Sequence, residues 1–239
     1  MLRRKILNSV VKETRQYWKA EVKRPYFIQM AAGKEIGHKM ADLVEEKTAA
    51  LLTVKFQTKY QRDSKGHKRI RSMGDVWVLD GNIYHPVNVK TGVVGSEGQP
   101  NLVSLKRLLS AIIEKQIDSY YLLMIKMDIP DNINANSIKP SVVFTDILDW
   151  LPHIAFDAGP GQMMLKAKNF FQHYDSHSAP TRTLSEKLGD LFAHYQDGQQ
   201  RLKENRERDL VKYRDAVEKF LKNANQDVTP DTQKGLGLQ

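Results

Sequence analysis

The segment from Gly74 to Thr91 constrains the fold of this chain more than any other. Its β-branched and aromatic residues flank Asp80-Gly81, a dipeptide that suits the positive φ angles of a hairpin turn. We therefore predict two short antiparallel strands joined by a tight turn. Asp75 begins the first strand, and Asn88 and Lys90 lie on the second. Because Asn88 and Lys90 are two residues apart, they project from the same face of that strand.

An acid, a second oxygen ligand and a lysine in this arrangement are what a metal-dependent phosphodiesterase needs. Hard divalent cations such as Mg²⁺ prefer oxygen ligands. Asp75 would supply a carboxylate, Asn88 its side-chain carbonyl and Val89 its backbone carbonyl. Lys90 would lie near the attacking water, where it orients the water or stabilises negative charge in the transition state. The alternative is an ordinary hairpin with an exposed lysine, since the spacing itself is common.

The remaining pattern mixes helices and strands, which indicates an α/β class with a central mixed sheet flanked by helices. We predict a single domain over residues 1–239. The predicted helices are 2–24, ended by Pro25, then 34–44 and 101–113, with Asn101 as N-cap, and a short helical segment at 146–151. The predicted strands are 51–60, 119–127, 141–145 and 162–167, and a turn is expected at 157–161.

The C-terminal part is helical and highly charged over residues 183–224, with breaks expected at Gly189 and at Asp197-Gly198. Residues 225–239 are expected to be a frayed tail. A stripe of apolar side chains in the helical segment would pack either on the core or on another subunit. The stripe comprises Leu202, Leu210, Tyr213, Val217, Phe220 and Leu221.

The net charge of +9 and the pI near 9.5 favour a polyanionic partner, because a basic surface gains from counterion release on nucleic acid. The alternative is a basic protein without such a partner. Lys68, Arg69 and Arg71 lie in a polar loop just before Asp75, where they would bring a phosphate backbone to the site or simply be solvated. No cysteine, no export signal and no apolar run of about 20 residues is present, so we expect a cytoplasmic protein without a membrane partner.

The layout of an acid, a hairpin and a lysine resembles the PD-(D/E)XK nuclease superfamily, in particular the blunt-cutting class of type II restriction endonucleases. The resemblance extends over most of the chain in the same order. Besides Gly74-Asp75 and Asn88-Val89-Lys90-Thr91, it rests on Ala31-Ala32-Gly33 before a helix, Pro100-Asn101 at the next helix, and Thr181-Arg182 before the charged C-terminal helix.

This resemblance implies a restriction-endonuclease-like fold and Mg²⁺-dependent cleavage of double-stranded DNA at a short palindrome, leaving 5′-phosphate ends. It also implies a homodimer, whose two-fold symmetry would mirror that of the DNA site. Two other functions stay open. One is a repair or junction nuclease of the same fold, and the other is a non-cleaving DNA-binding protein with a vestigial metal site.

Residue by residue, the first acid of the family falls on Asp75, the second on Asn88 and the lysine on Lys90. The loop after the lysine, from Thr91 to Asn101, would approach DNA. Gln99 and Asn101 would hydrogen-bond to base edges, and the turn from Asp157 to Gln162 is a second base-reading candidate.

Asn88 departs from the family pattern, because an amide stands where a carboxylate is expected. The amide keeps the shape and one oxygen ligand but removes a unit charge from the metal site. Three explanations are open. The residue was substituted to hold an uncleaved complex; it is native, with slower or metal-selective chemistry; or another carboxylate, such as Glu35 or Glu97, supplies the charge.

Overall fold

The computed structural model describes residues 1–32, 38–59, 73–94, 100–134, 136–157, 161–166, 170–172, 174 and 182–226. The chain divides into two compact units, Met1–Tyr195 and Gln196–Gln239. The first unit has the α/β architecture that the sequence predicts. In the second, the described residues belong to a helix that begins in the first unit.

A mixed sheet of five strands in the order β1-β2-β3-β5-β6 forms the centre of the first unit. β2 and β3 form the predicted antiparallel hairpin, β3 and β5 run parallel, and β5 and β6 run antiparallel. The hairpin turn lies one residue later than predicted, because Asp80 pairs with Ile83 and Gly81 has a φ of 63°. The strands are β1 (Thr58–Lys59), β2 (Val76–Asp80), β3 (Ile83–Val93), β5 (Tyr121–Asp128) and β6 (Lys139–Asp146).

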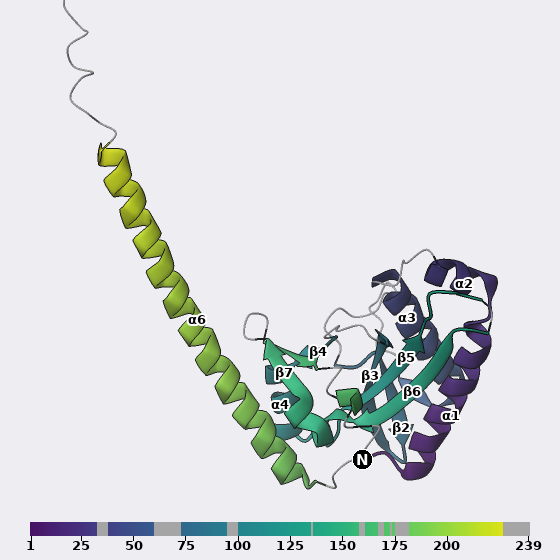
Figure 1. Ribbon diagram of the computed structural model, residues 1–239. Helices are drawn as coiled ribbons and strands as arrows, with labels where there is room; N and C mark the ends of the chain where they lie inside the picture. Colours follow the sequence, from purple (N-terminus) through teal and green to yellow (C-terminus); the bar gives the residue numbers. More distant parts are fainter. Residues whose placement is uncertain are drawn as a thin grey trace, which may run out of the picture. The chain divides into compact units, whose positions relative to one another are not determined.

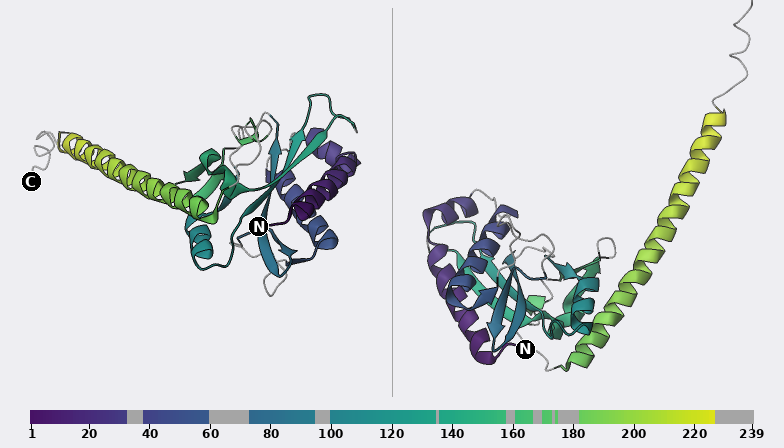
Figure 2. Two further views of the ribbon diagram at one scale, coloured as in Figure 1. Left: turned by 90° about the horizontal axis from the view of Figure 1, so that it is seen from below. Right: turned by 180° about the vertical axis from the view of Figure 1, so that it is seen from behind.

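Three N-terminal helices cover one face of this sheet (Figure 1, Figure 2). They are α1 (Arg4–Glu21), α2 (Pro25–Ala32) and α3 (His38–Lys55). α1 packs against β6, and α3 packs against β2 and β3. The apolar face of α1 buries Val10 and Trp18 in one core with Val87 and Val89 of β3. The Trp18 indole donates a 2.9 Å hydrogen bond to Thr48 Oγ1, which fixes α1 against α3.

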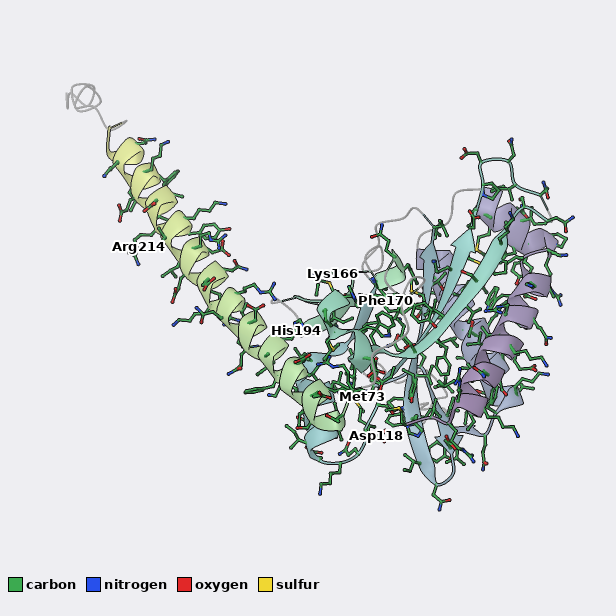
Figure 3. All side chains as sticks on the ribbon, turned by 60° about the horizontal axis from the view of Figure 1, so that its bottom comes forward. Met73, Asp118, Lys166, Phe170, His194 and Arg214 are labelled. Carbon is green, nitrogen blue, oxygen red and sulfur yellow. The ribbon has the colours of Figure 1, made fainter. Side chains whose placement is uncertain are left out.

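A second core lies on the opposite face of the sheet, beneath a smaller sheet in the order β4-β8-β7. Phe170, labelled in Figure 3, is fully buried in this core, and its ring meets that of Trp150 edge-on with 5.4 Å between centroids. The elements on this side are β4 (Asn101–Ser104), α4 (Leu105–Ile113), the 3₁₀ helix η1 (Ile147–His153), β7 (Ile154–Asp157) and β8 (Gln162–Leu165).

The structure corrects three of the predicted elements. Residues 51–55 continue helix α3, leaving β1 as a two-residue strand, because the fully buried Leu52 packs as a helical residue while Val54 faces solvent at 82 % exposure. Pro25 begins α2, since proline suits the first turn of a helix. Asn101 lies in β4, so it is not the cap of α4, which starts at Leu105.

The C-terminal helix α6 (Leu184–Gln226) runs through Gly189 and Gly198 without the predicted breaks. One glycine costs a helix only about 1 kcal/mol relative to alanine, which a helix of 43 residues tolerates. Thr183 and Glu186 form a capping box at its start, with 2.7 Å between Thr183 N and Glu186 Oε2. Among the described residues, no helix carries an apolar stretch suited to crossing a lipid bilayer.

Candidate active site

Asp75 lies at the start of the hairpin, where Gly74 lets the chain pass close to β3. A side chain at position 74 would place its Cβ 2.9 Å from Val87 N and 3.0 Å from Val87 O. The close approach lets Asp75 N donate a 2.8 Å hydrogen bond to Val87 O. The Asp75 carboxylate is mostly buried, and its Oδ2 accepts a 2.7 Å hydrogen bond from Val89 N. The carboxylate is therefore fixed beside the strand that carries Asn88 and Lys90.

Asn88 is held by two hydrogen bonds from its amide nitrogen. Nδ2 donates to Leu102 O at 3.0 Å and to the Tyr120 hydroxyl at 2.9 Å. The side-chain oxygen Oδ1 is buried and meets no hydrogen-bond donor in the described part of the chain. A buried acceptor without a donor is costly unless a ligand satisfies it. The orientation of the amide follows from Leu102 O, which only accepts hydrogen bonds.

Tyr120 supports Asn88 from the core on the opposite face of the sheet. It is fully buried, and this burial raises the pKa of its hydroxyl well above the ordinary range. The hydrogen bond from Asn88 acts against the rise in pKa, while the negative charge of Asp75 adds to it. The hydroxyl therefore stays protonated at neutral pH and acts as a neutral support for Asn88.

Lys90 forms an ion pair with a carboxylate that sequence reasoning missed. Its Nζ lies 3.0 Å from Oε2 of Glu45 in α3, and the two side chains are 15 % and 17 % exposed. The pairing of β2 with β3 ends at Val76 and Val87. Lys90 lies three residues further along β3, beyond the end of β2, and its side chain reaches α3. Nothing local in the sequence indicates this contact, because the two residues are 45 positions apart. Glu35 and Glu97, the carboxylates considered from the sequence, lie outside the described residues.

The small sheet carries three of the base-reading candidates: Asn101, Asp157 and Gln162. Asp157 of β7 pairs with Gln162 of β8, and Gln162 pairs with Ser104 at the end of β4. The exposed Asn101 begins the same β4 strand. The hydrogen bond from Asn88 to Leu102 O attaches this sheet directly to the candidate metal ligand.

The other predicted DNA contacts are placed differently. Thr91 pairs with Ile125 inside the central sheet, and its hydroxyl is buried. Gln99, Lys68, Arg69 and Arg71 lie outside the described residues.

A basic groove of about 1050 Å³ lies between α1 and the edge strand β6. Lys126 on its wall occupies the β5 position opposite Gly92, two residues beyond Lys90 on β3. Within the described part of the chain, no Asp or Glu lines the groove. Its cations are Arg4, Lys12, Arg15, Lys19 and Lys126.

The oxygens of this site fit a hard divalent cation. In the described residues, no group of three or more Asp, Glu, His or Cys side chains is arranged to hold a metal ion. Asp75 nevertheless brings one carboxylate to the strand that carries Asn88, whose buried Oδ1 meets no donor among the described residues. One carboxylate with neutral oxygens is a donor set that Mg²⁺ accepts, with water completing its shell.

Comparison with known proteins adds no assignment: no model of a protein family matches the chain, and no curated protein matches it.

Proposed function

We propose that this chain is a Mg²⁺-dependent, sequence-specific endonuclease of double-stranded DNA with a restriction-endonuclease-like fold. The observation that supports this most is the cluster at the hairpin. The buried carboxylate of Asp75 lies just before β2. The buried Asn88 oxygen, which meets no donor in the described part of the chain, and the ion-paired Lys90 lie on the adjoining segment of β3.

Asp75, the Oδ1 of Asn88 and the backbone carbonyl of Val89 would hold the cation, which lowers the pKa of a bound water and stabilises charge on the phosphoryl oxygens. Lys90 donates hydrogen bonds to the attacking water or to a phosphate oxygen. Glu45 orients the Lys90 ammonium group and brings a second carboxylate to the site. We take Asn88 as the native residue, since its Nδ2 fits the acceptor Leu102 O.

The DNA would be bound through two surfaces. Asn101, Asp157 and Gln162 on the small sheet would read base edges, and the basic groove on α1 would bind phosphates. Cleavage of both strands of a palindrome requires two copies related by a two-fold axis, and the products carry 5′-phosphate ends.

Replacing Lys90 by alanine tests the proposal most selectively. Lys90→Ala is expected to lower the rate of Mg²⁺-dependent plasmid cleavage roughly 100- to 1000-fold, because a charge that acts on the transition state is lost. DNA affinity, measured by fluorescence anisotropy without divalent metal, is expected to change little. Lys106→Ala, at an exposed lysine of α4, is the matched control and should cleave like the unchanged protein. Loss of affinity with cleavage per bound complex unchanged would contradict the role of Lys90.

A second candidate function is sequence-specific DNA binding without cleavage. The amide at position 88 favours it, since the cluster then carries less negative charge than a nuclease site with two ligand carboxylates. An unchanged protein that shifts plasmid DNA on a gel but leaves it intact in Mg²⁺ would establish this function. Nicking or branch-dependent cleavage would instead indicate a repair or junction nuclease.

A further inference from the structure

The distal part of α6 carries a stripe of apolar side chains that solvent reaches. Leu210, Tyr213, Val217 and Phe220 are 63 %, 67 %, 55 % and 71 % exposed. Their spacing of three, four and three residues places them along one side of the helix. Exposed apolar patches rimmed by polar residues are typical of surfaces that bind a protein partner, a ligand or a membrane.

The spacing matches two successive heptads, in which Leu210 and Val217 take a positions and Tyr213 and Phe220 take d positions. This pattern fits a single partner helix packed side by side. Asp209 and Arg214 line the open surface that Leu210, Tyr213 and Val217 form on this helix. Figure 3 shows the labelled Arg214 projecting from α6.

Asp209 and Arg214 occupy g and e positions of this repeat. Five residues turn a helix by roughly 140° beyond a full turn, so the two side chains lie on opposite flanks and do not meet within one helix. In a parallel, in-register pair of identical helices, each g residue faces the e residue five positions later on the other helix. Asp209 of each copy then faces Arg214 of the other copy, and both contacts are attractive.

We propose that residues 206–224 of α6 form a parallel two-stranded coiled coil with the same segment of a second copy of this chain. In a two-fold contact the same surface of each copy meets its equivalent. Here the apolar stripe packs against the same stripe, and Asp209 of each copy faces Arg214 of the other. The charged Lys203 and Arg206 occupy the preceding a and d positions and end the seam. Because the seam spans only about two heptads, the pairing is weak and depends on protein concentration. This inference does not depend on the proposed nuclease function.

Sedimentation equilibrium of the full chain over a range of concentrations tests the pairing without any measurement of cleavage. The unchanged protein is expected to dimerise. Asp209→Arg and Arg214→Asp each place like charges across both flanks and are expected to weaken the dimer at least tenfold. An equimolar mixture of the two variants, and a chain with both substitutions, restore opposite charges and dimerisation. Lys212→Glu, which changes charge away from the stripe, is the control that keeps the dimer.

Each of three outcomes would contradict the coiled coil. A monomer at every concentration refutes the coiled coil, and a dimer that neither single variant weakens places the contact elsewhere. Weakening by both variants without recovery in the mixture contradicts the parallel orientation. Phe220→Ser adds a further check, since its side chain is exposed and its loss is expected to abolish pairing without unfolding the helix.

Discussion

At the scale of single residues, Asn88 distinguishes this site from one built on two ligand carboxylates. Its amide nitrogen satisfies Leu102 O and the Tyr120 hydroxyl, while Oδ1 remains for a ligand. A carboxylate in the same position would place one of its oxygens about 3.0 Å from a carbonyl oxygen, where neither atom is a donor. The surroundings of position 88 therefore suit an amide.

Asn88→Asp is accordingly expected to destabilise the metal-free protein by about 1–3 kcal/mol at neutral pH, because a buried acceptor loses its donor. Urea unfolding without divalent metal measures this change. Asn101→Asp introduces the same charge at an exposed position and is expected to stay within about 0.5 kcal/mol of the unchanged protein. Equal stability of Asn88→Asp and the unchanged protein would show that the Leu102 contact does not select the amide.

Asp75, Asn88 and Lys90 could be proposed as site residues from the sequence, because their spacing along a hairpin is a local property. Sequence reasoning could not identify Glu45 or Tyr120, whose contacts with Lys90 and Asn88 arise only when distant segments pack together. The buried Lys187 of α6 is another example. Its side chain is 1 % exposed, and its Nζ lies 2.8 Å from Asp146 Oδ2 and 2.7 Å from Asp149 Oδ1. The neighbouring residues in the sequence indicate only an ordinary charged helix.

At the scale of elements, the hairpin was predictable because residue alternation and a glycine turn act together. Short apolar runs were less informative. The alternation that starts at Val54 predicted a strand over 51–60, yet residues 51–55 continue α3, since periodicity over a few residues does not separate a helix from a strand. The polar start of β4 was taken for a helix cap, because Asn101 precedes an amphipathic helix whose first residue lies four positions later.

Gly74→Ala tests whether the close approach at the start of β2 holds the site together. The added Cβ would meet the Val87 backbone at 2.9 Å, so the strand start must shift, at a cost of about 1–3 kcal/mol. The rate of DNA cleavage is expected to fall together with the stability, because the shift of the strand start moves Asp75. Gly189→Ala is the control: among the described residues, no atom outside its own stretch of helix lies within 4 Å of the added Cβ, and the change is expected to stabilise the helix by about 1 kcal/mol. Unchanged stability and cleavage of Gly74→Ala would contradict this account.

At the scale of the whole molecule, the structure locates some of the cations that give the chain its net charge of +9. The basic groove gathers cations of α1 beside the edge of the central sheet, and none of its described lining residues is acidic. This groove and the hairpin site belong to the same compact unit, whereas the apolar stripe of α6 belongs to the other. Charge alone predicted a polyanionic partner, but only the packing of α1 on β6 shows where these cations gather.

Replacing Lys12, Arg15 and Lys19 together by alanine is expected to weaken DNA binding and to reduce the slope of log affinity against log salt by about 2–3, since each phosphate contact contributes about 0.9. A salt titration followed by fluorescence anisotropy measures the slope. The cleavage rate at saturating protein is expected to stay the same.

Lys212, Lys219 and Lys222 of α6, all exposed, provide the control with the same loss of charge. Their replacement by alanine is expected to leave the slope close to that of the unchanged protein. Equal slopes for both triple variants would show that the groove does not bind the phosphate backbone.

The most direct test of the hairpin site is digestion of a linear DNA of known sequence by the unchanged protein, with Mg²⁺ and with EDTA, followed by sequencing of the ends. We expect discrete fragments in Mg²⁺ alone, each ending at one short palindrome and carrying a 5′-phosphate. Intact DNA in Mg²⁺, with the protein still bound to it on a gel, would contradict the nuclease function.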